Sequence, residues 1–345
     1  MSVWKFLLRL SIGIALVVLL LHKHGVQMQG ILWRMTELPP LILLSAILLD
    51  LGGRLLSAYR WGLLSALAGK TVGFGRIAQL YYSGLFFSLC LPTSIGGDVF
   101  RVVGLSRDTG SKSAAFASVF MDRNVGMAAL LALGTTASIL LPAASIQATV
   151  YKVPYVVPLW PLFLLLCAGY VLANIILFSD GFCLLVTSLV SRLRLGFVGE
   201  KASRLHQGVQ AYRQPLNRYL LVFLLSLAYQ ASEVALIWLL ARGLGIELSP
   251  LVFCALVPFQ AVACLLPITF SGVGVREYVF CAVLIGQLGQ GIQDKALALS
   301  LVYFLGVMVI SSLVGGLVYV LSGLSRPSEA EAAAAANPTA SGMQS

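Results

Sequence analysis

The sequence predicts an all-α integral membrane protein with about six full transmembrane helices and two opposed re-entrant helical hairpins in an inverted repeat. Of its 345 residues, 59% are hydrophobic and 10% are charged, which leaves too little polar surface to cover a soluble globule. Uncharged runs at 124–151, 153–179 and 296–325 each exceed the roughly 20 residues that cross a bilayer as a helix. A transmembrane β-barrel would instead show alternating polar and apolar residues.

Apolar segments follow one another along the chain. The first segment, 6–22, is preceded by Lys5 and contains Arg9. We interpret it as a retained helix, and not as a signal peptide, because no small-residue cleavage site follows it. From Arg326 onward Ser, Pro, Ala and Glu replace the apolar pattern, so we predict a membrane domain at 1–324 and a disordered tail at 325–345. The apolar segments are 6–22, 39–56, 77–91, 114–141, 154–178, 219–242, 250–266, 276–292 and 296–322.

The basic residues indicate which segments cross the membrane. If 77–97 crossed fully, the basic loops 101–123 and 192–218 would lie outside, although Lys and Arg normally stay on the cytoplasmic side. If 77–91 enters, turns at 92–97 and returns, most of the 23 Lys and Arg residues lie inside. We therefore predict a multi-pass membrane protein with both termini in the cytoplasm. The net charge of +10 is then explained by Lys and Arg in cytoplasmic loops, which set the orientation in the membrane, so no nucleic-acid partner is expected.

By the same reasoning a second hairpin, 250–292, enters from the opposite face. Its turn at 266–276 repeats the pattern of 91–101: Leu-Pro, a hydroxyl residue, a glycine five residues after the proline and an arginine nine after it. Full spans flank each hairpin, which gives pseudo-repeats at about 39–141 and 219–322. Inverted repeats with broken helices are a common plan of secondary transporters. Chance similarity of two Leu-Pro turns is the alternative, because the shared positions are few.

The two turns predict a shared polar cavity near the middle of the membrane. Gly96 and Gly97 in the first turn, and Gly272 and Gly274 in the second, are expected to adopt positive φ and expose backbone amides. A half-helix N-terminus with partial positive charge begins just after each turn, so an anion such as phosphate would be attracted there. The Gly-Gly-Asp sequence is not a P-loop, because it lacks the Gly-Lys-Ser/Thr ending and a preceding strand.

Arg101 and Arg276 are the first candidates for contact with a lipid headgroup or phosphate, because guanidinium binds phosphate bidentately and stays charged. Asp98, three residues before Arg101, would hold that side chain in place. Glu277 lies beside Arg276. The alternative is that these carboxylates only neutralise the arginines within the fold. Ionisable residues at membrane depth are costly and usually mark a pathway, which favours the functional interpretation.

Five further charged residues are secondary candidates. Glu233 has no basic residue within a turn of it, so it is either a proton carrier or a neutral carboxyl bonded to a neighbouring helix. Asp50 and Arg54 are spaced to pair as i and i+4. Asp122 and Arg123 follow the first hairpin and either extend its site or mark an interface.

No pattern in the sequence predicts side-chain catalysis or a bound cofactor. The six cysteines lack CxxC spacing and nearby His pairs, so we interpret them as small hydrophobic residues. Ser-His-Asp and Cys-His arrangements do not stand out either. We therefore expect no cofactor and no metal. Trp33, Trp61 and Trp160 are interpreted as anchors at the membrane interface.

Three groups of residues are similar to those of a known family. They are Leu91-Pro92 with Gly96-Gly97-Asp98 and Arg101; Asp122-Arg123 with Gly126; and Leu266-Pro267 with Ser271-Gly272-Val273-Gly274-Val275-Arg276-Glu277. Over roughly residues 5–322 the chain resembles the lysylphosphatidylglycerol synthase transmembrane-region family, the flippase-like membrane domain of the bacterial multiple peptide resistance factor, which also occurs as standalone proteins.

The resemblance implies movement of a lipid between the leaflets of the plasma (inner) membrane. In the best-known member that lipid is an aminoacylated phosphatidylglycerol, and archaeal relatives are linked to dolichol-phosphate sugar pathways. The chain departs from that member because no soluble aminoacyl-transferase domain follows its last span, so an enzyme is the less favoured interpretation. Six residues would line the headgroup route: Asp98, Arg101, Asp122, Arg123, Arg276 and Glu277.

Our leading hypothesis is a flippase-like transporter for a phospholipid or a polyprenyl-phosphate-linked lipid, which could serve a partner biosynthetic enzyme. The alternative is a membrane-embedded transferase or accessory subunit in lipid or glycan biosynthesis, with Asp98 or Glu277 as general base. A third hypothesis is a noncatalytic membrane scaffold.

Overall fold

The computed structural model describes residues 3–24, 28–67, 71–90, 96–141, 147–150, 153–156, 159–180, 210, 212, 216–265, 269–289 and 291–323. Four sequence predictions fall outside these residues in whole or in part. They concern the Leu-Pro positions of both turns, the basic segment 192–218 and the tail 325–345.

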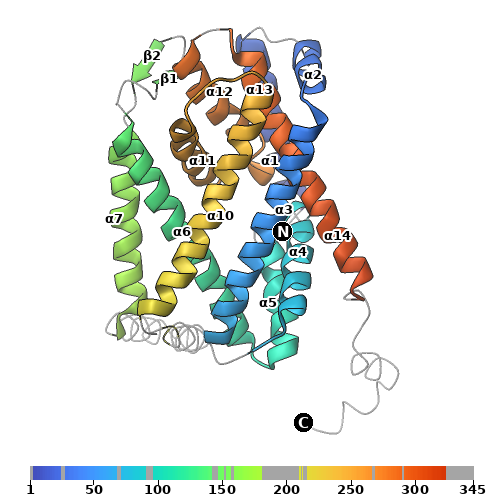
Figure 1. The fold of residues 1–345 in the computed structure, drawn as a ribbon, viewed down its shortest axis with the longest axis vertical. Coiled ribbons are helices and arrows are strands. Elements are labelled where there is room, and N and C mark those ends of the chain that lie inside the picture. Colours follow the sequence, from blue (N-terminus) through green and yellow to red (C-terminus); the bar gives the residue numbers. More distant parts are fainter. Residues whose placement is uncertain are drawn as a thin grey trace.

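The described chain is almost entirely helical (Figure 1), which confirms the predicted all-α class. Within the described residues, five helices are long and apolar enough to cross a membrane; they are α3, α6, α7, α10 and the continuous run from α13 to α14. In order, the elements are α1 (Val3–His24), α2 (Met28–Thr36), α3 (Pro40–Leu67), α4 (Phe74–Cys90), α5 (Gly96–Thr109), α6 (Lys112–Leu140), β1 (Gln147–Val150), β2 (Val153–Val156), α7 (Leu159–Phe178), α10 (Leu216–Gly243), α11 (Pro250–Leu265), the short 3₁₀ turn η2 (Phe270–Gly272), α12 (Val275–Leu288), α13 (Gln293–Leu301), the π-helical η3 (Val302–Val309) and α14 (Ile310–Leu321).

Within the described residues, the departure from the helical prediction lies before α7. Residues Val153–Val156, which the sequence analysis included in the span 154–178, form β2 and pair antiparallel with β1. Pro154 in β2 and Pro158 just before α7 explain the late helix start, because proline removes a backbone donor and clashes inside a helix. Pro161 is tolerated because it lies in the first turn of α7.

Helices α4 and α5 form the first hairpin. Their lengths are 17 and 14 residues, or about 25 and 21 Å of helix, and both are shorter than a bilayer core of about 30 Å. Gly97 lies in the first turn of α5, where a Cβ atom would collide with the Gly84 carbonyl oxygen and the Ser88 hydroxyl of α4. The expectation of positive φ at Gly96 and Gly97 is therefore wrong, since both residues are helical. Gly97 is instead needed for the close approach of α4 and α5.

Helices α11 and α12 form the second hairpin, at the opposite end of the molecule from the first (Figure 1). Here the glycine prediction is confirmed, because Gly272 and Gly274 adopt φ values of 74° and 88°. A Cβ atom on Gly274 would lie 2.7 Å from Leu16 Cβ of α1. The second turn is thus packed tightly against the first helix.

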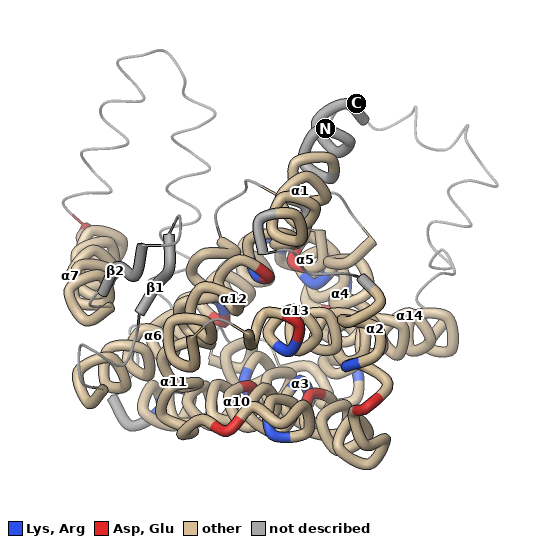
Figure 2. The backbone as a smooth tube through the Cα atoms, turned by 90° about the horizontal axis from the view of Figure 1, so that it is seen from above, with Lys and Arg blue, Asp and Glu red and all other residues tan. Residues whose placement is uncertain are grey.

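Packing between the two halves is reciprocal. Helix α4 of the first hairpin packs against α14, and α11 of the second hairpin packs against α6. The helices that precede the hairpins, α3 and α10, pack along each other. Seen from above, α13 lies in the middle of the bundle with α3, α10 and α12 around it (Figure 2). This exchange of partners is the packing expected of an inverted repeat.

We predict that Gly97→Ala lowers the midpoint of thermal unfolding in detergent. The added methyl group must push α4 and α5 apart, and overpacking of this kind costs about 1–3 kcal/mol. Gly52→Ala on α3 is the matched control, because nothing lies within 4 Å of a Cβ atom there. Equal unfolding midpoints for the two variants would contradict the packing argument.

Candidate functional site

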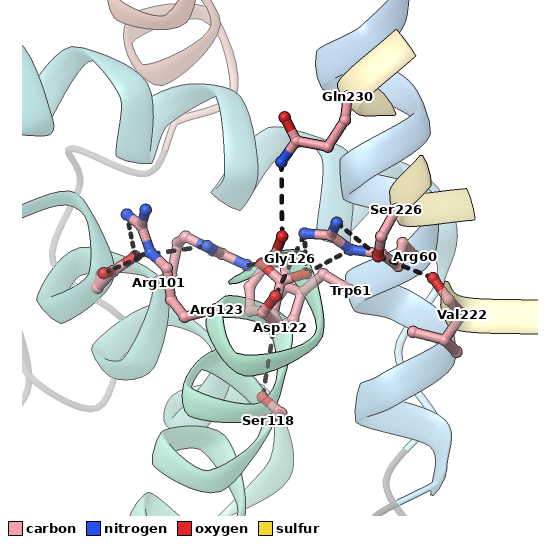
Figure 3. Close-up of polar contacts among 11 residues, drawn as sticks. Arg60, Trp61, Arg101, Ser118, Asp122, Arg123, Gly126, Val222, Ser226 and Gln230 are labelled. Atoms are coloured by element: carbon pink, nitrogen blue, oxygen red, sulfur yellow. Dashed lines mark hydrogen bonds and ion pairs between the residues drawn. The ribbon is translucent and has the colours of Figure 1, made fainter. Parts of the chain in front are cut away.

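One buried carboxylate joins three helices at the centre of the site. Asp122 of α6 is 2% exposed. Its Oδ1 atom accepts hydrogen bonds from Arg60 of α3 at 2.7 and 2.9 Å, and its Oδ2 atom accepts one from Arg101 of α5 at 2.7 Å. Figure 3 shows Asp122 between these two guanidinium groups. Because both partners are also buried, the three side chains compensate one another's charge away from water.

Aromatic rings complete the surroundings of Arg101. Its guanidinium carbon lies 4.2 Å from the Trp61 ring centroid and 4.6 Å from that of Tyr81, which are cation–π distances. Trp61 is fully buried and donates a hydrogen bond to Ser118. The interpretation of Trp61 as an interface anchor is therefore wrong, because this side chain holds the site.

Asp98 and Arg123 extend the ion network toward the surface. Arg123 donates hydrogen bonds of 3.0 to 3.3 Å to both oxygens of Asp98. Asp98 also contacts Arg101 at 3.4 Å, the pairing expected from their spacing. The side chain of Arg123 is 60% exposed. The charges thus alternate in one chain of contacts, which runs Arg60, Asp122, Arg101, Asp98 and Arg123.

The sequence analysis did not identify Arg60. It ended the second apolar segment at residue 56, whereas α3 continues to Leu67 and Arg60 is 5% exposed. Arg60 also donates a hydrogen bond of 2.9 Å to Ser226 of α10. The absence of Gly and Pro between Arg54 and Leu67, apart from Gly62, was the signal that the helix continues.

A second buried group lies between α3, α10 and η3. Arg54 contacts Asp50 at 3.1 Å, as the i, i+4 spacing predicts, and also Glu233 at 3.5 Å. Tyr229 and Tyr303 each donate a hydrogen bond to Glu233. The apparent isolation of Glu233 in the sequence disappears in the fold, because its basic neighbour comes from another helix.

The second turn places Arg276 and Glu277 differently from Asp98 and Arg101. Glu277 accepts hydrogen bonds from the Gly274 amide at 2.5 Å and from Ser300 at 3.1 Å, so it caps the N-terminus of α12. Arg276 is 1% exposed, with its guanidinium carbon 4.5 Å from the Phe304 ring centroid. It also donates to the Met308 sulfur, at 2.9 Å. Both residues are enclosed by protein.

Two neighbouring cavities connect the groups. The first, of about 300 Å³, is bounded by α3, α4, α5, α6, α10 and α11, and Gly97 is among its lining residues. The second, of about 190 Å³, reaches Ser271 of the second turn and Met308, the sulfur partner of Arg276. Both are lined by Arg54 and Arg123. The charged residues of the first cavity are Arg54, Arg60, Arg101, Arg123, Asp98 and Asp122.

The fold and this site define a class, a multi-pass helical membrane protein whose two opposed hairpins flank a buried network of ion pairs. The chain matches the lysylphosphatidylglycerol synthase TM region over residues 6–318 and belongs to that family, as the resemblance predicted. Membership indicates a membrane-lipid-related function. A comparison with curated proteins finds no match to the chain.

We predict that Asp122→Asn destabilises the protein strongly. The substitution leaves the buried guanidinium groups of Arg60 and Arg101 without the carboxylate that both pair with, and breaking a buried ion pair costs about 3–5 kcal/mol of unfolding free energy. Thermal unfolding in detergent measures the effect. Asp108→Asn is the control, because its pair with Arg76 lies at the surface, where such pairs contribute at most about 1 kcal/mol. Similar midpoints for both variants would show that Asp122 does not hold the site together.

Proposed function

We propose that this protein is a flippase-like transporter that binds the phosphate of a phospholipid or a polyprenyl-phosphate-linked lipid and moves the headgroup across the plasma membrane. The observation that carries the proposal is the wall of the first cavity, where four arginines face two aspartates. The lining itself has two more arginines than aspartates, because Asp50 and Glu233, the carboxyl groups that pair with Arg54, are not part of it. Guanidinium groups at the cavity wall attract an anion. Guanidinium groups match phosphate oxygens in geometry, and the attraction is stronger away from bulk water.

The contacts suggest different roles for the arginines. Arg60 and Arg101 are committed to Asp122 and hold the helices together. Arg123 is largely exposed, and among the described residues its ion-pair partner is Asp98, so it can exchange that partner for a phosphate at a small cost. We assign Arg123 the first contact with the headgroup. Arg101 then supports the cavity wall.

An adjoining apolar groove favours a lipid over a soluble anion. A groove of about 240 Å³ lies between α5 and α6, and Asp98 and Arg123 line both it and the first cavity. Its other walls are apolar, and Val99, Val103 and Phe116 are 55%, 45% and 45% exposed. A phosphate bound at Arg123 would leave an attached acyl or polyprenyl chain beside this groove.

The arrangement of hairpins and cavities supports alternating exposure of one site. The hairpins lie at opposite ends of the molecule, and the two cavities lead from the first hairpin to the second turn. Re-entry of each hairpin from its own side would bring the two turns to the middle of the bilayer. With both termini in the cytoplasm, the first hairpin enters from inside and the second from outside.

A transferase is less well supported by the same contacts. Asp98 is held by two arginines, and Glu277 by a backbone amide and a serine, so neither has an unshared position from which to accept a substrate proton. Service to a partner biosynthetic enzyme remains compatible with transport, since a lipid product of that enzyme could be the cargo.

We predict that Arg123→Gln slows transfer of fluorescent phosphatidylglycerol between leaflets in proteoliposomes by about 10- to 100-fold, because a hydrogen bond to a charged group contributes about 1.5–3 kcal/mol. Arg76→Gln is the control, since Arg76 pairs with Asp108 at the surface. Wild-type transfer no faster than in protein-free liposomes would overturn the proposed function.

We also predict that Val102→Trp, which fills the groove, weakens binding of dioctanoyl phosphatidylglycerol by about tenfold and leaves binding of glycerol phosphate unchanged. Two displaced methylene groups account for this change at about 0.8 kcal/mol each. The control is Val171→Trp, at an exposed position of α7. Equal loss of both ligands would show that the groove does not receive the lipid chain.

A further inference from the structure

Two buried carboxyl groups share one arginine. Asp50 is 1% exposed and Glu233 is 6% exposed. Arg54 lies 3.1 Å from Asp50 Oδ1 and 3.5 Å from Glu233 Oε1. If both carboxyls were ionised, the group would carry one net negative charge inside the membrane, which is unfavourable.

One acceptor atom in this group lacks a donor. Glu233 accepts hydrogen bonds from Tyr229 at Oε1 and from Tyr303 at Oε2, and Asp50 Oδ1 accepts from Arg54. Asp50 Oδ2 is buried and has no hydrogen-bond partner among the described residues. Arg54 brings the two carboxyl groups together, because its guanidinium contacts both of them. A proton held between Asp50 Oδ2 and Glu233 would supply the missing donor, and so avoid the cost of a buried acceptor without a hydrogen bond.

We propose that Asp50 and Glu233 together bind one proton, and that this proton balances the negative charge of a lipid phosphate bound in the first cavity. Only the link between this proton and a lipid phosphate rests on the proposed function. Arg54 connects the two sites, because it touches both carboxyls and also lines both cavities.

Among the described residues, the other arginines nearby do not pair with these two carboxyl groups. Arg60 pairs with Asp122, Arg123 pairs with Asp98, and the guanidinium carbon of Arg276 lies 5.9 Å from the Tyr303 ring centroid. Tyr82 of α4 donates its hydroxyl to the Leu51 carbonyl. The titratable and charged groups around the pair are therefore Arg54, Tyr81, Tyr82, Tyr229, Tyr303, Arg276, Asp122 and Arg123.

Charge balance explains why a phosphate would require the proton. The lining of the first cavity and the shared pair together contain four arginines and four carboxyl groups, so the site is neutral when all are ionised. One bound proton leaves one positive charge, which equals the charge of a phosphodiester in magnitude. Loss of that proton to water, with no other bond changed, restores two carboxylates that hold Arg54 and favours release of the phosphate. The counted groups are Arg54, Arg60, Arg101, Arg123, Asp50, Asp98, Asp122 and Glu233.

Infrared difference spectroscopy of the purified full-length protein between pH 5 and 9 tests the proton directly. The wild type should show the carbonyl band of a protonated carboxyl group that disappears at high pH, and the band should be lost in both Glu233→Gln and Asp50→Asn. Asp108→Asn should keep it, because Asp108 lies at the surface. A wild type without such a band, or a band that survives both substitutions, would overturn the proton site.

The coupling is tested by binding of dioctanoyl phosphatidylglycerol over the same pH range. Wild-type affinity should fall with rising pH by up to about tenfold per pH unit, the limit for one linked proton. Glu233→Gln should bind independently of pH, because the side-chain amide that this substitution introduces can donate to Asp50 Oδ2 and imitate the protonated pair. Parallel pH profiles for the two proteins would refute the coupling. Absence of lipid binding at every pH, with the infrared band present, would instead contradict the proposed function and leave the proton site supported.

Discussion

The Asp122 carboxylate is the constraint on which the rest of the site depends. A buried carboxylate must be compensated, and Asp122 is compensated by Arg60 of α3 and Arg101 of α5, while Ser226 ties Arg60 to α10. Helix α5 cannot leave α6 without exposing an unpaired charge to the interior. Helix α5 of the first hairpin is therefore fixed on one face by its ion pair with Asp122 and on the other by the close contact of Gly97 with α4. The cavity lies beside this fixed hairpin, so its arginines are held in position before any ligand arrives.

The charged residues divide into a group with short buried contacts and a group held less tightly. Arg60, Arg101 and Glu277 have short contacts to buried partners, and these contacts fix α3, α5 and the start of α12. Arg54 and Arg123 are held less tightly, and both line the two cavities. The π-helical segment η3 adds to this second group, since Tyr303 and Met308 lie on it and contact Glu233 and Arg276. Such bulges often occur at functional sites. The proposed transport would need both kinds of residue, because one part of the site would have to remain fixed while another changed partner.

Much of the fold followed from local features of the sequence, whereas the partners within the site did not. Short apolar segments, turn glycines and the distribution of Lys and Arg were enough to predict two opposed hairpins flanked by long helices. The pairing of Asp98 with Arg101 was also visible as a spacing of three residues. Arg60 pairs with Asp122 across 62 positions, and Arg54 meets Glu233 from another helix, so no spacing rule reveals either contact. Gly97 was correctly predicted to matter at the first turn, but the predicted positive φ was wrong. Close helix packing and positive φ both select glycine, so the sequence does not distinguish them.

Native mass spectrometry of the purified protein tests the central claim most directly, that the arginine-lined cavity binds a lipid phosphate. The protein would be equilibrated with phosphatidylglycerol and phosphatidylcholine of the same chain length, and the wild type compared with Arg123→Gln. The account predicts preferential retention of phosphatidylglycerol by the wild type and loss of that preference in the variant. Equal retention of both lipids by the wild type, or an unchanged preference after the substitution, would contradict it.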